Sequence, residues 1–172
     1  IKKLLEEVKD REFIGYSYDG ADASFELLAR RIMGEIPRYI SIKEYDVSVK
    51  KNSSGKIISS AKAQLEVDKK LILCEGEGNG PVHALDNAIR QNVDKLAKYS
   101  HYLKDLKLVD YKVRILNTGT EAVTRVAIES TDSQGKNWFT IGVSANIIDA
   151  SFKALVDSLD YKLFKDKAPA SL

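Results

Sequence analysis

The sequence predicts an α+β protein made of two pseudo-symmetric βββα units, preceded by a small helical subdomain. Alternating apolar and polar residues indicate three short strands between residues 45 and 74, and three more between 111 and 143. Each group of strands is followed by a turn and then by a helix with an apolar stripe. We therefore expect four regions: a helical linker subdomain at 1–36, repeats at 38–101 and 102–163 that together form a domain spanning 37–163, and a flexible tail at 164–172.

The first 36 residues have the pattern of two helices. The opening stretch, Ile1 to Glu7, is amphipathic because charges interrupt every apolar pair. Residues 15–20 form a turn, after which Asp19 or Asp22 can cap a second helix that Gly34 and Pro37 should end. The apolar positions of this second helix recur at three- and four-residue steps at Ala23, Leu27, Leu28 and Ile32.

The first repeat is expected to contain strands at 45–49, 57–67 and 71–74, with a hairpin turn at 52–55. A glycine-rich turn then leads into a helix that starts at Pro81, a favourable first helical residue. Its apolar stripe predicts a helix that reaches Leu96.

The second repeat follows the same order, with strands at 111–115, 123–130 and 138–143 and a turn at 117–119. Asn146 can cap its helix. Residues 44–49 align with 110–115, and 62–66 align with 125–129. Two such units leave sheet edges and helix faces that a second chain can cover, so we expect a homodimer, with a self-sufficient monomer as the alternative.

Composition excludes several classes of function. Lys and Arg number 27 against 25 Asp and Glu, a net charge of +2 that gives no long-range attraction to nucleic acid. No stretch is long and apolar enough to span a membrane. The one cysteine, Cys74, excludes an internal disulfide and suits a reducing compartment, so we expect a cytoplasmic protein with neither nucleic-acid nor membrane partners.

Nothing in the sequence supports catalysis within this chain. His83 and His101 are not at a metal-ligand spacing, and the chain has no nucleophile elbow, P-loop or paired-carboxylate arrangement. Cys74 lies in a short apolar run, where a buried structural thiol is expected. We therefore predict no catalytic residue and no metal ligand.

Two patterns suggest binding. The turn Gly78-Asn79-Gly80-Pro81 opens a helix, whose free N–H groups can hold a carboxylate or phosphate, although the glycines can also serve only to make a tight turn. Ser144 and Asn146 offer the same geometry in the second repeat. A further set, Leu96, Tyr99 and Leu103, shares one helix face, which can either pack on the core or wall an apolar pocket.

At these motifs the sequence resembles a known family. Residues 78–88, GNGPVHALDNA, resemble the GxGPVDAxxxA signature of the α-isopropylmalate synthase regulatory domain, with His83 in place of the usual acidic residue. Residues 111–126 and 138–158 are similar to the second half of that domain. The stretch 20–28, GADASFELL, resembles the linker of the citramalate synthase branch, so we favour that branch.

The resemblance implies the regulatory part of an acyltransferase that condenses acetyl-CoA with a 2-oxo acid. The family's catalytic barrel, with its divalent metal, is not encoded here, because such a barrel needs about 250 residues. The chain alone is therefore expected to be inactive and to hold no cofactor. Its expected partners are a second copy, its own barrel, and isoleucine (or, in the other branch, leucine) as feedback inhibitor.

The family's pattern of pocket positions implies an apolar wall made of Leu96, Tyr99, Leu103, Val109 and Val113. The helix N-termini at Gly78 to Pro81 and at Ser144 to Asn146 would then meet the effector carboxylate. Two other hypotheses stay open: a structural dimerisation module without a working effector site, and an independent small enzyme with an unusual site.

Overall fold

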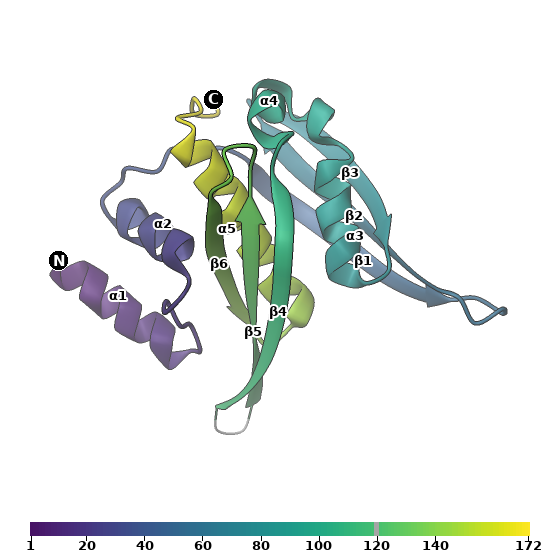
Figure 1. The fold of residues 1–172 in the computed structure, drawn as a ribbon, viewed down its shortest axis with the longest axis horizontal. Helices are drawn as coiled ribbons and strands as arrows, with labels where there is room; N and C mark the ends of the chain where they lie inside the picture. The colour runs from purple at the N-terminus through teal and green to yellow at the C-terminus, as the bar shows by residue number, and fades with distance from the viewer. Residues whose placement is uncertain (119–120) are drawn as a thin grey trace. The chain divides into compact units, whose positions relative to one another are not determined.

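The computed structural model describes residues 1–118 and 121–172 and confirms the α+β class (Figure 1). The chain forms two compact units. The first-repeat unit comprises Pro37–Lys104 and Asp166–Leu172, and the second-repeat unit comprises Ile1–Ile36 and Asp105–Lys165. Within the described residues, no helix is long and apolar enough to cross a membrane.

The first-repeat unit has an antiparallel sheet in the order β1-β2-β3, with α3 on one face. Its elements are β1 (Ser41–Lys51), β2 (Ile57–Val67), β3 (Lys70–Gly78), α3 (Pro81–Arg90), the short helices η1 (Val93–Lys95) and η2 (Ala97–Tyr99), and α4 (Ser100–Leu103). The predicted hairpin turn forms because the Asn52 side chain accepts hydrogen bonds from the backbone of Ser54 and Lys56.

The second-repeat unit repeats this arrangement, with the sheet order β4-β5-β6 and α5 packed on β5 and β6. Its elements are α1 (Lys2–Phe13), α2 (Asp22–Ile32), β4 (Lys107–Thr118), β5 (Glu121–Thr131), β6 (Asn137–Ser144) and α5 (Ile147–Lys165). The turn predicted at 117–119 lies partly outside the described residues.

Glycines in the third strand of each repeat let the helix lie close to the sheet. A Cβ atom on Gly76 would lie 2.3 Å from the backbone nitrogen of Ala88 in α3. A Cβ on Gly142 would lie 2.0 Å from the carbonyl oxygen of Ala150 in α5. Both distances are far below van der Waals contact, so neither position accepts a side chain without moving the helix.

The strand register confirms the repeat but corrects part of the alignment. Each first strand has an irregularity at the same place, between Ile42 and Glu44 in β1 and between Leu108 and Asp110 in β4. However, Tyr45 pairs with Ala63, whereas Tyr111 pairs with Ile128. The alignment of 62–66 with 125–129 is therefore wrong by two residues. Side chains alternate with period two, so a shift of two residues preserves the apolar face and leaves no trace in the pattern.

The helix after the glycine-rich turn is shorter than predicted. It ends at Arg90, because the Asn92 side-chain amide donates to the carbonyl oxygens of Ala88 (2.7 Å) and Glu75 (2.9 Å). Ala97 then has a left-handed backbone (φ +51°), which a continuous helix does not allow. Short helical turns thus replace the predicted long stripe.

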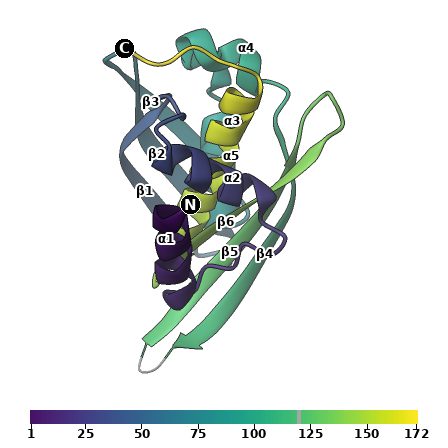
Figure 2. The same cartoon turned by 90° about the vertical axis from the view of Figure 1, so that its left-hand side faces the viewer.

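Both ends of the chain pack within these units. In the second-repeat unit α2 packs against α5 and β6, so residues 1–36 are integral to that unit (Figure 2). Residues 166–172 belong to the first-repeat unit, where Ala168 is buried and Leu172 N–H donates to Asp68 at 2.8 Å. These hydrogen bonds explain how a segment without apolar periodicity acquires a defined position.

Candidate functional site

The N-terminus of α3 is open. Gly80 precedes the helix with an extended backbone, Pro81 is its first residue, and no side chain of the described residues caps it. The amides of the first helical turn can therefore bind an anion. Gly78 serves packing, since a Cβ there would lie 2.7 Å from the Ala84 nitrogen. Asn79 donates its backbone N–H to Nδ1 of His83 at 3.2 Å.

The N-terminus of α5 is capped instead. The Asn146 side-chain oxygen accepts from the amides of Ile148 (2.8 Å) and Asp149 (3.2 Å). The Ser144 hydroxyl in turn accepts from the Asn146 amide at 3.2 Å. Ser144 and Asn146 thus satisfy the local backbone, as an N-cap does. The two helix N-termini therefore differ in their backbone amides: those of α5 already have a side-chain acceptor, whereas those of α3 have no side-chain cap.

The five expected wall residues lie in different surroundings. Leu96, Tyr99 and Leu103 are fully buried in the core of the first-repeat unit, and the Tyr99 hydroxyl donates to the Pro169 carbonyl oxygen at 2.8 Å. Their burial agrees with the core-packing alternative that the sequence left open. In the second-repeat unit the Val109 side chain is 51% exposed at the irregularity of β4, and Val113 is 40% exposed.

Apolar side chains remain exposed on the first strand of each sheet. Val49 pairs with Ser59, and Val113 pairs with Val126, so both valines project from the helix-covered face. They lie on the strand farthest from the helix, which packs mainly on the other two strands. Ile115 is exposed on the same face of β4. Exposed apolar groups that gather on one face are typical of protein–protein interfaces.

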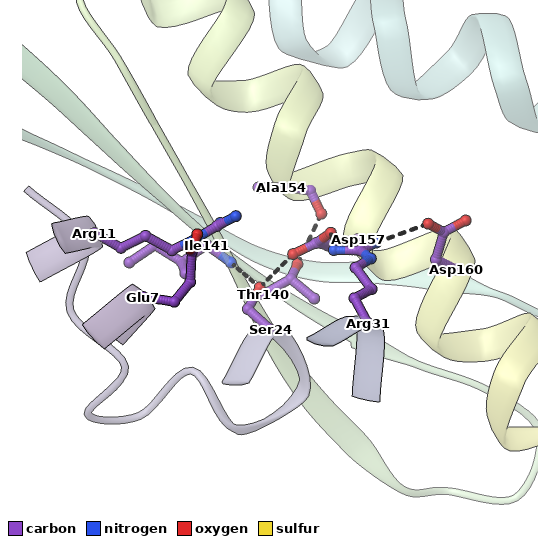
Figure 3. A network of polar contacts seen from close by, with 9 residues as sticks. All are labelled: Glu7, Arg11, Ser24, Arg31, Thr140, Ile141, Ala154, Asp157 and Asp160. Carbon is purple, nitrogen blue, oxygen red and sulfur yellow. Dashed lines mark hydrogen bonds and ion pairs between the residues drawn. The ribbon is translucent and has the colours of Figure 1, made fainter. Parts of the chain in front are cut away.

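A polar network between α2, α5 and β6 has no counterpart among the sequence predictions (Figure 3). The buried Ser24 hydroxyl accepts from the Ile141 amide at 2.9 Å and donates to the Asp157 carboxylate at 2.8 Å. Arg31 donates to Asp157 at 2.9 Å and to Asp160 at 2.8 Å. Burial raises the pKa of Asp160 to about 6, against the attraction of Arg31. The Asp157 and Asp160 spacing shows that both lie on one face of α5, but no local pattern connects them to residues 126 or more positions away.

A buried ion pair holds the far end of α5. Asp132 and Lys162 are fully or almost fully buried, and Lys162 Nζ lies 2.8 Å from Asp132 Oδ2 and 3.3 Å from Asp105. Lys165 also binds Asp132. Although burial opposes ionisation, hydrogen bonds from Lys162 and Lys165 lower the pKa of Asp132 to about 2.

Comparisons with known proteins agree with the resemblance found in the sequence. The family model described as the LeuA allosteric (dimerisation) domain matches residues 19–163. The (R)-citramalate synthase of Geobacter sulfurreducens is 44% identical over 96% of this chain, and that of Aquifex aeolicus is 43% identical over 97%. A 2-isopropylmalate synthase of Clostridium acetobutylicum is 34% identical over 72%. The matches cover 31%, 31% and 21% of the lengths of these relatives, so the chain spans less than a third of each.

Proposed function

The chain belongs to the LeuA allosteric (dimerisation) domain family, and from this membership we propose that it is the regulatory portion of a citramalate synthase. The observation that carries the proposal is the 44% identity to a citramalate synthase across 96% of the chain, against 34% across 72% for the 2-isopropylmalate synthase. In the full-length protein, acyl transfer from acetyl-CoA to pyruvate belongs to the catalytic part, and this chain regulates it in the cytoplasm.

The first element of the proposal is dimerisation, which the family description implies. The exposed apolar side chains on the helix-covered faces of β1 and β4 support it, because a second copy would remove them from water. Sedimentation of the purified chain tests this element: a concentration-dependent dimer is expected. A monomer at every concentration would refute it.

The second element is binding of isoleucine as feedback inhibitor. A branched amino acid needs fixed donors for its carboxylate and an apolar surface for its side chain. The uncapped N-terminus of α3, at Gly78 to Pro81, supports the first requirement, and the exposed Val109 and Val113 support the second. Ser144, Asn146, Leu96, Tyr99 and Leu103 remain in the proposed site, although their present partners would have to change for them to meet the effector.

The proposed mechanism is thermodynamic linkage. Isoleucine would bind one arrangement of the dimer better than another. The difference in binding free energy would shift the populations of the active and inactive conformations of the catalytic part. Distinguishing isoleucine from leucine depends on the position of one methyl group, worth about 1–3 kcal/mol in a shaped pocket.

Calorimetric titration of the chain with isoleucine, leucine and valine tests the effector. We expect saturable binding led by isoleucine, weakened by Val113→Ser and unchanged by Lys112→Ser, a matched change at the neighbouring, opposite-facing position. Equal or tighter binding of leucine would contradict the isoleucine assignment.

Two other functions have specific support. The relationship to a 2-isopropylmalate synthase favours a leucine sensor, which a leucine preference would establish. The burial of Leu96, Tyr99 and Leu103 favours a structural dimerisation module, which would show no heat with any of the three amino acids.

A further inference from the structure

The second helix belongs structurally to the second repeat. Ala23 and Leu27 of α2 are fully buried in the second-repeat unit, and Ser24 is 3% exposed. At the turn that follows α1, a Cβ on Gly15 would lie 3.3 Å from both the Leu116 and the Val143 side chains, and Arg125 donates to the Gly15 carbonyl oxygen at 2.7 Å. Residues 1–36 thus contact β4, β5 and β6 of the second repeat through both apolar and polar groups.

Helix α2 also supplies acceptors to the outer edge of β6, which is an edge strand of its sheet. The amide of Phe139 donates to the Asp22 carboxylate at 3.2 Å, and the amide of Ile141 donates to the Ser24 hydroxyl at 2.9 Å. Unpaired edge amides require such partners when they are buried. The helix therefore replaces a missing strand along this part of the sheet.

At the other end of α2, Arg31 divides its guanidinium between Asp157 and Asp160, one turn apart on α5. Ser24 reaches Asp157 as well, at 2.8 Å. One carboxylate therefore joins both ends of α2 to the same helix (Figure 3). A charge-assisted pair of this geometry fixes orientation in addition to contributing stability.

In the first repeat, edge groups of the third strand are paired from within the repeat. There, the edge carbonyls of Glu75 and Glu77 accept from Asn92 and Asn87, which come from α3 and the residues just after it. The edge of β3 is thus protected by its own repeat. Side-chain hydrogen bonds join the 1–36 segment to the second repeat within its own unit.

We propose that Ser24 and Arg31 form a coupling latch, through which the second repeat transmits effector occupancy to the catalytic part of the full-length protein. The latch rests on the proposed function, under which residues 1–36 connect the catalytic part to the regulatory repeats. Neither residue touches substrate or effector; both act as positioning residues, since they fix α2 on α5 and β6.

The test uses the full-length protein and measures its inhibition by isoleucine. Arg31→Gln and Ser24→Ala should leave kcat and KM without isoleucine unchanged, while the inhibition at saturating isoleucine falls by about tenfold, a typical coupling magnitude. Arg31→Lys keeps the charge and should recover part of the inhibition. The control is Arg38→Gln, which breaks an exposed pair with Glu66 in the first-repeat unit and should leave inhibition intact.

The outcomes separate the latch from the function on which it rests. If the wild-type protein is inhibited by isoleucine and Arg31→Gln is inhibited equally, the latch is wrong and the effector assignment stands. If the wild-type protein neither binds nor responds to any of the three amino acids, the regulatory function fails and the latch with it. Equal loss of inhibition in Arg38→Gln would also overturn the latch, because it would indicate general destabilisation.

Discussion

The two repeats share the same order of strands and helix and differ in which residues cover the faces and edges of their sheets. Both place an irregularity in the first strand and a glycine beneath the helix, at Gly76 and Gly142. The second repeat has α5 on one face of its sheet and α2 along its edge strand. In the described part of the first repeat, α3 covers one face of the sheet, and the opposite face carries Leu71 (64% exposed) and Leu73 (50% exposed). The edge strand of the second repeat is paired with a helix distant in sequence, whereas carbonyls of β3 in the first repeat are paired with residues of the same repeat.

A pair of aspartates shows what this difference means energetically. Asp68 follows the second strand of the first repeat and binds Lys98 at 2.8 Å, with both side chains about one-quarter exposed. Asp132 follows the second strand of the second repeat and binds Lys162 at the same distance, but with both side chains buried. The equivalent Asp–Lys ion pair is partly solvated in the first repeat and buried in the second. The same substitution should therefore change the free energy of unfolding by different amounts in the two repeats.

The largest expected effect comes from this pair. Asp132→Asn should lower the free energy of unfolding by about 3–5 kcal/mol, because it removes the nearer of the two carboxylates that pair with the buried Lys162. Asp68→Asn should change it far less, since water can solvate Lys98. Urea denaturation of both variants measures the difference. Equal losses would mean that burial does not distinguish the repeats.

The glycines test what the repeats share. Gly142→Ala and Gly76→Ala should each cost about 3 kcal/mol, because the new methyl group meets helix backbone that must shift. Gly80→Ala is the control, since Gly80 has an extended backbone and open space around its Cβ position. If only Gly142→Ala were destabilising, the close approach of α3 to its sheet would be in doubt.

The edge-strand contacts give a smaller and more local effect. Ser24→Ala should cost about 1–3 kcal/mol, because the buried Ile141 amide loses its acceptor, and hydrogen exchange of that amide should accelerate. Asn87→Ala in the first repeat should cost less, since its bond to the Glu77 carbonyl is exposed. Unchanged exchange at Ile141 in Ser24→Ala would show that α2 is not needed at this edge.

The smallest effect is a pH dependence with two opposite parts. Asp132, whose pKa is lowered from 3.8 to about 2, contributes stability above pH 4 that is lost as pH falls towards 2. Asp160, whose pKa is raised from 3.8 to about 6, contributes stability below pH 4 that is lost as pH rises through 6. Denaturation at pH 3, 5 and 7 should therefore show Asp132→Asn removing the acid-side change and Asp160→Asn removing the other. An unaltered profile in either variant would contradict its assignment.

The sequence was sufficient to predict elements whose causes are local. Alternation located β1, β2, β4 and β5, and the cap at Asn146 and the turn at Asn52 were evident from residue type and spacing. The two-unit architecture followed because the same order of elements occurs twice. Each of these features depends on interactions within a few residues.

Features that depend on distant partners were not predictable in the same way. The equivalence of the second strands of the two repeats was predicted two residues out of register, because a two-residue shift preserves the apolar face. The end of α3 was not predicted, because it depends on a hydrogen bond from the Asn92 side chain to the Glu75 carbonyl oxygen in β3. Of the candidate site, Asn146 was predicted both as a helix cap and as an effector ligand, and only the hydrogen bonds show that its side chain caps α5 in this structure. Arg31 and Asp157 are joined across 126 positions, beyond any periodic pattern.

The position of the last residues has a practical consequence for labelling the protein. The Pro169 carbonyl oxygen is the acceptor for the Tyr99 hydroxyl, and Ser171 and Leu172 bind Asp68. Removal of the residues after Lys165 would expose the Tyr99 hydroxyl and uncover the Asp68 turn. A fluorophore or affinity tag is therefore better inserted in the exposed hairpin at 52–55, where a change of sequence leaves both cores intact.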